Sequence, residues 1–186
     1  LEEVCVNADL DVETILLDDA SDDDTIGVAT HLKERHHLLN IRVVHRFEPR
    51  RGYGALLRYG MAHATGRFCL LAAADGAHPI EQIPAYLREA RQGAELVQCS
   101  RYERSEDSAE IPRKFRIYQA LYRRAVRLLL RWDVRDPTCS FRLVNRVYIQ
   151  AVGVRANGLA VIPEISFKTL LSGGKIVFIP GRQSFR

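Results

Sequence analysis

The chain has 186 residues, of which 47% are hydrophobic, and it carries a net charge of +4. This size and composition fit one globular domain with a full core, and the lack of a long apolar run or a signal-peptide pattern predicts a cytoplasmic protein without a membrane-spanning helix. The basic excess is local, because arginines crowd 101–131 whereas acids dominate 1–24, so we expect 101–131 to face an anionic partner.

Strands and helices alternate along the predicted fold. Strand-like runs cover 13–18, 41–46, 67–73, 96–100 and 175–180, and helical patterns cover 24–37, 54–64, 80–92, 112–132 and 163–172. This alternation is typical of an α/β fold with a mostly parallel central sheet flanked by helices.

The first strand ends in acids, within the stretch "LLDDASDDDT" at 16–25. Ser21 and the acids after it can cap the helix that begins near Thr25, but capping does not explain Asp18 and Asp19. Carboxylates at the carboxyl end of a parallel strand suit a ribose, a base edge or a metal.

Two glycines, Gly52 and Gly54, precede the next helical pattern. They permit close backbone approach at a helix start, where free N–H groups favour anions. The third glycine of the dinucleotide fingerprint is missing at the required spacing, which argues against a Rossmann dehydrogenase.

Asp75 follows the apolar strand in "FCLLAAADGAHPI" at 68–80. It is either a carboxylate of a functional site or a cap of the following turn, and the residues alone leave both interpretations open. His78 in the same stretch is a lone histidine at a turn, a position that is more often structural than catalytic.

The segment 113–131 predicts a basic amphipathic helix. Its apolar positions share one face and its arginines cover the rest; the apolar set is Tyr118, Leu121, Tyr122, Ala125, Leu128, Leu129 and Trp132, and the arginines are Arg116, Arg123, Arg124, Arg127 and Arg131. Either the apolar face packs on the core and the arginines are solvated, or the helix lies at an anionic membrane surface or over phosphate groups.

The four cysteines, Cys5, Cys69, Cys99 and Cys139, are widely spaced and show no metal-ligand pattern. We expect free, buried thiols.

Six segments in order resemble the family-2 glycosyltransferases, which have a GT-A fold, and above all their dolichyl- or polyprenyl-phosphate mannosyltransferase branch. The similar segments are "LLDDASDDDT", "RGYGALLRYGMAHATG", "AADGAHP", "CSRY", "DPTCSFRLVNR" and "PEISFKTLLSGGKIVFIP". The resemblance covers nearly all of 1–186 and implies a single catalytic domain, without the family's first strand and its Pro-x-Tyr-Asn-Glu motif, and without the family's C-terminal end.

The resemblance implies inverting transfer of a sugar from a GDP- or UDP-sugar to a polyprenyl phosphate at the cytosolic membrane face, with peripheral membrane contact through 113–131 and no nucleic-acid partner. It assigns the donor to Asp18, Asp19, Ser21, Gly52, Gly54 and Asp75, the acceptor phosphate to Arg101, Arg116 and Arg142, and catalysis to Asp75, Arg101, Arg142 and Glu164. An ionised acceptor phosphate needs no general base, because its second pKa is about 6.

Asp75 aligns with the second, metal-binding acid of the family's Asp-Ala-Asp motif, and Ala73 replaces the first. Mg²⁺ commonly takes only one or two protein carboxylates, so the resemblance still implies Mg²⁺ or Mn²⁺ at Asp75, held more weakly than in the family.

Three alternatives stay open. The same fold can glycosylate a saccharide or another hydroxyl acceptor, which needs a carboxylate base such as Glu164 or Asp136. Ala73 also suits a degenerate sugar-nucleotide binder without activity. A sugar-phosphate nucleotidyltransferase is disfavoured, because its glycine-rich loop belongs near the first strand.

Overall fold

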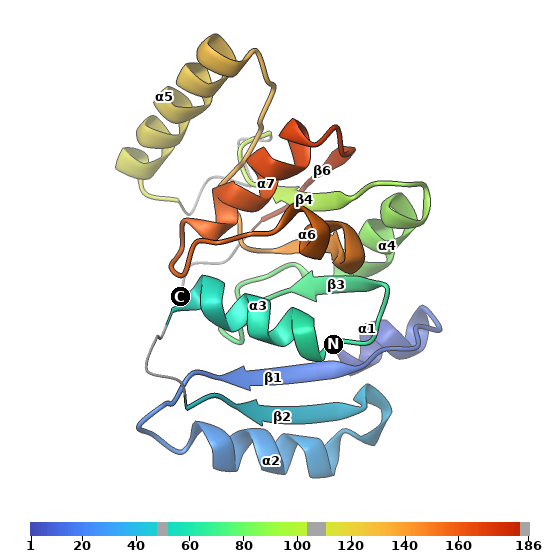
Figure 1. Ribbon diagram of the computed structural model, residues 1–186. Helices are drawn as coiled ribbons and strands as arrows, with labels where there is room; N and C mark the ends of the chain where they lie inside the picture. The colour runs from blue at the N-terminus through green and yellow to red at the C-terminus, as the bar shows by residue number, and fades with distance from the viewer. Residues whose placement is uncertain (48–51, 104–110, 183–186) are drawn as a thin grey trace.

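The computed structural model describes residues 1–47, 52–103 and 111–182 (Figure 1). The strands are β1 (Thr14–Asp18), β2 (Ile41–His45), β3 (Phe68–Leu71), β4 (Leu96–Ser100), β5 (Arg142–Asn145) and β6 (Ile176–Pro180). The helices are α1 (Glu2–Asn7), α2 (Thr25–Arg35), α3 (Tyr53–His63), α4 (Ile83–Arg91), α5 (Arg113–Leu130), α6 (Arg146–Val152) and α7 (Val161–Leu171), with 3₁₀ turns at His37–Leu39 and Ile80–Gln82.

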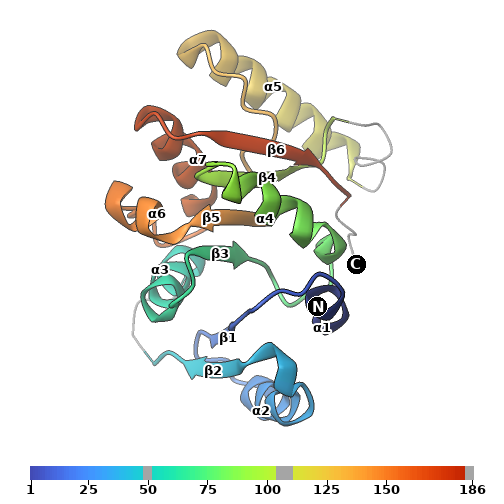
Figure 2. The ribbon, with the colours of Figure 1, turned by 90° about the vertical axis from the view of Figure 1, so that its right-hand side faces the viewer.

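The fold is the predicted α/β arrangement, with helices on both faces of a strand layer. Figure 2 shows α3, α6 and α7 on one side of the layer and α1, α2 and α4 on the other. The strands and helices predicted from the sequence are all present, with ends shifted by up to three residues. Three short elements of seven residues or fewer were not predicted from the sequence: β5, α6 and α1.

Hydrogen bonding divides the strand layer into two sheets. One has the order β3-β5-β4-β6, with β5 antiparallel to both neighbours and β6 parallel to β4, and the other is the parallel pair β1-β2. In Figure 1, β1 lies beside β3 and points the same way. The two sheets are joined by packing, since Leu17 of β1 contacts Gly60 of α3, whose neighbour Met61 belongs to the main core.

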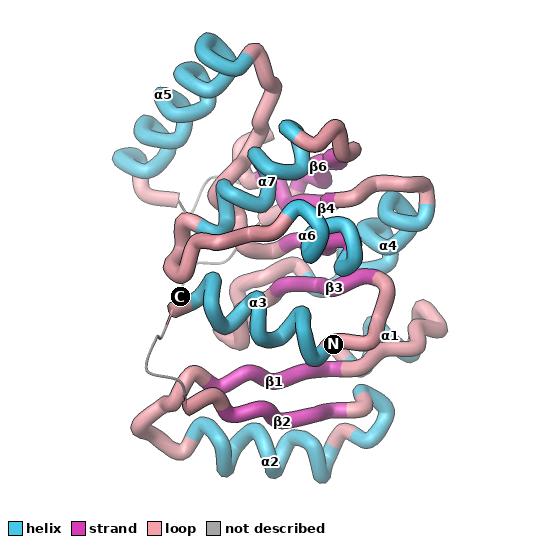
Figure 3. Tube along the Cα trace, viewed as in Figure 1, coloured by secondary structure: helices cyan, strands magenta, loops and turns pink. Residues whose placement is uncertain are grey.

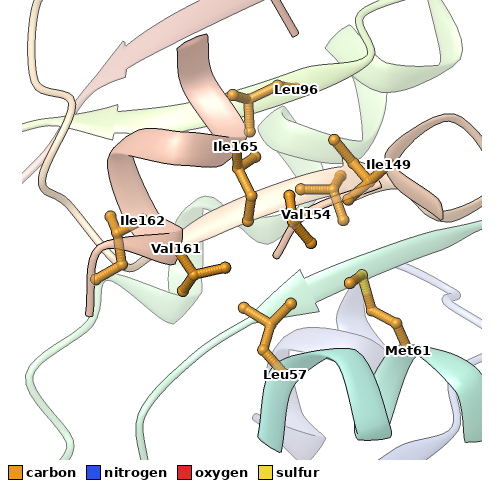
Figure 4. Packing of buried hydrophobic residues seen from close by; sticks show 9 residues of the cluster. Leu57, Met61, Leu96, Ile149, Val154, Val161, Ile162 and Ile165 are labelled. Atoms are coloured by element: carbon orange, nitrogen blue, oxygen red, sulfur yellow. The ribbon is translucent and has the colours of Figure 1, made fainter. Parts of the chain in front are cut away.

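The main core lies where α3, α6 and α7 cover the four-stranded sheet. Leu57 and Met61 of α3 meet Leu96, Ile149 and Ile165 in this cluster (Figure 4). A second cluster packs α4 against the other face of the same sheet. Every residue of β4 is buried, so the core is centred on the four-stranded sheet rather than on β1-β2.

Helix α5 does not pack as a core helix. It projects from the body in both views (Figures 1 and 2), and Val126 is its one buried residue. The apolar side that was a candidate core face points to solvent, with Leu121 60% and Leu128 80% exposed. The side turned to the body carries the half-buried Arg116 and Arg123 instead, so the core-packing interpretation of the apolar face is wrong.

All four cysteines are free; Cys5, Cys99 and Cys139 are buried and Cys69 is half-buried. Among the described residues, no helix combines the length and the apolar character needed to cross a bilayer.

Candidate active site

The carboxyl ends of β1, β2, β3 and β4 face one edge of the strand layer, on the left in Figure 1, and the loops that follow β1 and β3 lie there (Figure 3). The antiparallel strand β5 begins at this edge. Ligands of α/β sheets bind at such an edge, and the site residues predicted from the ends of β1, β3 and β4 therefore lie along it.

Asp18 ends β1 as a buried carboxylate. It accepts hydrogen bonds from the Ser21 hydroxyl and from the Ser21 N–H, the latter at 3.1 Å, and its Oδ2 lies 2.7 Å from Nδ1 of His45. The Ser21 hydroxyl is the main cause that lowers the pKa of Asp18, and His45 adds to it. Asp18 is therefore ionised at neutral pH and fixes the loop that carries Ser21.

Asp19 joins three elements at the same edge. Its Oδ1 accepts from Nε of Arg46, just beyond β2, at 2.8 Å, and its Oδ2 accepts from the N–H of Gly52, before α3, at 2.9 Å. Gly52 has φ +138°, which favours glycine, and a Cβ there would lie 2.6 Å from the carbonyl oxygen of Asn157. The structure thus brings Asp18, Asp19, Ser21 and Gly52 together.

The start of α3 is occupied by the chain's own backbone. The carbonyl of Asn157 accepts from the N–H groups of Gly54, at 2.7 Å, and Ala55, at 3.1 Å. Gly54 is required because a Cβ there would collide with the carbonyl of Ala156. The close approach predicted for Gly54 is present, but its partner is the loop 155–158, so the expected free N–H groups at this helix start are engaged.

Glu164 holds that loop from α7. Its two carboxylate oxygens accept from the N–H groups of Arg155 and Ala156, each at 2.8 Å, and Lys168 lies 2.9 Å away. Burial acts against the charge, but the hydrogen bonds from Lys168, Ala156 and Arg155 keep the pKa of Glu164 below its usual value. Both oxygens are engaged in these contacts, which position the loop at the start of α3.

Asp75 lies on the exposed loop after β3. Its Oδ1 accepts from the N–H of Ala77 at 2.9 Å, which is the turn-capping contact, and its Oδ2 has no hydrogen-bond partner among the described residues. Ala73 is exposed as well. The loop therefore holds one carboxylate with an oxygen available to a ligand.

His78 anchors the same loop. Its Nδ1 accepts from the N–H of Ala73 at 3.2 Å, so Nε2 carries the proton and donates to the Ser140 hydroxyl at 3.1 Å. The ring stacks on Phe141, and burial lowers the pKa of His78. A neutral imidazole that donates to a serine does not activate it as a nucleophile, so His78 has a structural role.

One protein carboxylate is consistent with a divalent cation held mainly by a substrate. Within 1–47, 52–103 and 111–182 there is no group of three or more His, Cys, Asp or Glu side chains suited to a metal. The unpartnered Oδ2 of Asp75 is a hard oxygen ligand of the kind that Mg²⁺ and Mn²⁺ take, and Mg²⁺ usually completes its shell with substrate phosphates and water.

Arg101, after β4, forms a buried ion pair with Asp136. Nε and Nη2 of Arg101 donate to the two oxygens of Asp136 at 2.7 and 2.9 Å, and Nη2 also donates to Thr138 at 2.9 Å. Burial opposes the charge of Arg101, but the Asp136 carboxylate raises its pKa above the usual value. The pair fixes the loop 136–138 to the end of β4.

Arg142 is buried completely at the start of β5. Its guanidinium donates to the carbonyls of Cys139, at 3.1 Å from Nε, and Ile162, at 2.7 Å, and approaches the Ser166 hydroxyl at 3.4 Å. Burial lowers the pKa of Arg142 to about 10, and this still leaves a positive charge at neutral pH. Arg116 differs from Arg101 and Arg142. Its side chain is half-buried and has no hydrogen-bond or ion-pair partner in the described parts of the chain.

Three residues at this edge were not predicted as site residues: His45, Arg46 and Asn157. His45 is the last residue of β2 and Arg46 follows it, and both fall within the strand predicted over 41–46. Asn157 acts through its carbonyl. A main-chain contact of that kind leaves no signal in the residue type.

The family model for glycosyl transferase family 2 matches residues 1–153. The chain belongs to this family. Among its relatives, the chain is 26% identical over 173 residues to the dolichol-phosphate mannosyltransferase of Pyrococcus furiosus, which covers 92% of this chain and 47% of the relative. It is 42% identical over 65 residues to the dolichyl-phosphate beta-glucosyltransferase of Drosophila melanogaster, or 35% of this chain and 20% of the relative. The chain thus spans half or less of these relatives.

Solved structures of glucosyl-3-phosphoglycerate synthase from Mycobacterium tuberculosis share the GT-A fold of this family-2 chain. The complex with uridine diphosphate matches with a TM-score of 0.68 at 21% identity, over 92% of this chain and 60% of the other. The complex with Mn²⁺, uridine-diphosphate-glucose and glycerol 3-phosphate matches with a TM-score of 0.65 at 22% identity, over the same shares. At this identity the likeness establishes the fold alone.

Proposed function

We propose that the chain is the catalytic domain of an inverting glycosyltransferase that moves a sugar from a GDP- or UDP-sugar to a polyprenyl phosphate. The observation that carries the proposal is that Asp18 and Asp19 lie at the carboxyl end of β1 and that Asp75 follows the carboxyl end of β3, since both strands point to the same edge of a GT-A strand layer (Figure 1). The relatives named for dolichyl phosphate support the acceptor.

The donor nucleotide is assigned to the end of β1, where Asp18 and Ser21 form a fixed loop and Asp19 links β1 to the start of α3. Asp75 would hold a divalent cation, Mg²⁺ or Mn²⁺, together with the donor diphosphate. When bound, such a cation offsets the negative charge that develops on the leaving nucleoside diphosphate. The structures of glucosyl-3-phosphoglycerate synthase with Mn²⁺ and a UDP-sugar support a metal for this fold.

The acceptor phosphate is assigned to the arginine side of the site. Arg116 is the direct-contact candidate, since its guanidinium has no partner among the described residues, whereas Arg101 and Arg142 are held by Asp136 and by backbone carbonyls. We propose that these two arginines contribute positive charge near the acceptor phosphate and hold the segment 136–141 in place. A phosphate acceptor is largely ionised at neutral pH, so no general base is needed.

The hydroxyl-acceptor alternative has less support. It needs a free carboxylate base, but Glu164 is engaged by two N–H groups and Lys168, and Asp136 by Arg101. A degenerate binder remains the second candidate, because Ala73 replaces the first acid of the metal motif. In either case we place the protein at the cytosolic membrane face, in contact through 113–131.

The test is a thermal-shift panel of GDP-, UDP- and dTDP-sugars, with Mn²⁺ or with a chelator. A ligand well above its dissociation constant stabilises the folded state, by about 2.7 kcal/mol at a hundredfold excess. We expect one nucleotide class to raise Tm, and the rise to shrink with the chelator. A flat panel contradicts the proposal, and a rise without sugar transfer favours the degenerate binder.

A further inference from the structure

Helix α2 carries an exposed apolar pair between two opposite charges. Val28 is 57% and Leu32 38% exposed, whereas Ala29 is buried. Asp24 precedes Val28 by four residues and Arg35 follows Leu32 by three, so helical spacing places these four side chains on one stripe, the α2 stripe. Asp24 and Arg35 are both exposed, and within the described ranges neither side chain has a hydrogen-bond or ion-pair partner.

The α2 stripe lies on a flank of the helix. Successive helical residues are turned by about 100°, so Val28 and Leu32 lie about 100° and about 60° around the helix from the buried Ala29. In Figure 2, α2 is the last of the described helices in its row, with α1 and α4 on one side of it. An exposed flank at the end of such a row can accept a further helix packed on the same side of the sheet.

The strand next to α2 also ends its layer. β2 lies at the border of the strand layer in Figure 1, and its outer edge has no partner among the described strands. Its sequence, "IRVVH", contains none of the prolines or lysines that commonly protect an edge strand. An unprotected edge of this kind can pair with a strand of another chain.

The midpoints of α2 and β2 lie at nearly the same level. The helix packs on the strand and runs antiparallel to it (Figure 1). Eleven helical residues and five strand residues are each about 16 Å long, so Thr30 at the middle of α2 lies near Val43 at the middle of β2. One two-fold axis can therefore relate both elements to a second copy.

We propose that two copies of the chain form a dimer about a two-fold axis near Thr30 and Val43. In this dimer β2 pairs antiparallel with β2 of the second copy, and the two α2 helices pack antiparallel on the same side of the joined sheet. The same surface meets itself, as a two-fold interface requires. The dimer goes beyond the proposed function and does not depend on it.

The charges of the α2 stripe are complementary to themselves in this arrangement. At 1.5 Å per residue, Asp24 lies about 9 Å from Thr30 along the helix axis, and Arg35 lies about 7.5 Å from it in the other direction. Antiparallel packing thus brings Asp24 to nearly the level of Arg35 of the second copy, and symmetry repeats the pair. Between these two ion pairs, Val28 lies opposite Leu32 of the second copy.

The paired strands are compatible as well. With Val43 on the two-fold axis, Arg42 lies opposite Val44 of the second copy and Ile41 lies opposite His45. No two like charges are directly opposite each other, which would destabilise the pairing. The N–H and C=O groups of the outer edge of β2 gain partners in the second copy.

The size of the surface determines how tightly the copies hold. The α2 stripe is about 16 Å long and about 10 Å wide, or about 160 Å². The outer edge of β2 and Leu38, which is 70% exposed, add to it, but we expect the total to stay below the roughly 800 Å² per partner of a standard interface. The dimer should therefore have a dissociation constant of about micromolar.

The test exchanges charges in the full chain and follows association by sedimentation velocity over a range of concentrations. Asp24→Lys and Arg35→Glu each bring like charges together at both ends of the interface. An equimolar mixture of the two variants restores opposite charges at both ends, but only in a heterodimer. The matched controls are Asp11→Lys and Arg91→Glu, which alter exposed charges outside α2 and β2.

Circular dichroism and Tm establish that each variant is folded. Asp24 makes no side-chain cap hydrogen bond, so its substitution should leave the start of α2 intact.

We expect the native chain to dimerise and each single variant to raise the dissociation constant by about tenfold, because two attractive pairs become repulsive. The mixture should return to about the native value, and the controls should dimerise like the native chain. Hydrogen exchange in 25–35 and 41–45 should slow as the native chain dimerises.

A native chain that stays monomeric at the highest concentration reached overturns the proposal, and the α2 stripe then has a partner other than a second copy. A native dimer that Asp24→Lys and Arg35→Glu leave intact also overturns it. So does a mixture of these two variants that associates no better than either variant alone.

Discussion

The carboxylates of Asp75 and Glu164 have different surroundings. Asp75 is exposed, has one hydrogen bond from a neighbouring N–H and keeps one oxygen without a partner in the described chain. Glu164 uses both oxygens to hold the loop 155–158. Substitution at these two positions therefore distinguishes a group that binds a ligand from one that maintains structure.

Asp75→Asn should abolish the metal-dependent part of nucleotide-sugar binding, measured by isothermal titration calorimetry with and without Mn²⁺. The asparagine carbonyl can still accept from Ala77, so the free energy of unfolding should change by no more than about 0.5 kcal/mol. Asp11→Asn, an exposed acid elsewhere, is the control. Metal-dependent binding that survives in Asp75→Asn would show that Asp75 is only a turn cap. Ala73→Asp should be tolerated, because position 73 is exposed.

Glu164→Gln should lower the free energy of unfolding by about 1–2 kcal/mol, because the amide can replace one of the two carboxylate acceptors but leaves an N–H of residue 155 or 156 without its partner. Urea unfolding at pH 7 measures this. The lowered pKa of Glu164 adds a pH dependence: its stabilisation is present above the unfolded-state pKa and is lost as the pH falls through the folded-state value. A loss of catalysis with unchanged stability would instead identify Glu164 as a base.

At the scale of elements, the contact between the start of α3 and the loop 155–158 is central, because it joins an element of the donor side to α7. Gly54 and Asn157 make it through backbone atoms. Its tightness excludes a side chain at position 54.

Gly54→Ala should destabilise the protein by about 1–3 kcal/mol, the usual cost of overpacking. The sign of this change in stability separates the close contact from helix propensity. Alanine in a helix interior is normally favoured over glycine by about 1 kcal/mol, so helix propensity alone would make the variant more stable. Gly158→Ala is the control in the same loop, as its Cβ would meet nothing within 4 Å. Equal stability of Gly54→Ala and the native chain would mean that the loop moves aside freely.

Over the whole molecule, the strand layer has a hydrogen-bonded centre and a less tightly held border. β4 is buried throughout, whereas four of the five residues of β1 and of β2 are half-buried, and among the described strands these two pair only with each other. We expect amide hydrogen exchange, followed by mass spectrometry, to be faster in 14–18 and 41–45 than in 96–100. Equal protection would indicate that the two sheets open as one cooperative unit.

Sequence periodicity predicted the α/β class and the long elements, because a parallel strand buried on both faces and an amphipathic helix each leave a clear pattern. It missed β5, whose four residues give too short a run, although Arg142 at its start was singled out. In α5 the periodicity predicted which residues share one side of the helix, but it did not predict whether that side packs on the core or is exposed. Likewise, Gly54 signalled a close approach, and only the structure identified its partner as Ala156.

The most direct test of the account is sugar transfer itself. The protein is incubated with Mn²⁺, a polyprenyl phosphate in detergent and the radiolabelled nucleotide-sugar selected by the thermal-shift panel. Transfer is measured as the label that enters the organic phase. 3-Phosphoglycerate and a free saccharide are added as competing acceptors. We expect a lipid-linked product that requires the phosphate group and is lost in Asp75→Asn. Label that enters only a water-soluble product, or no product despite donor binding, would contradict it.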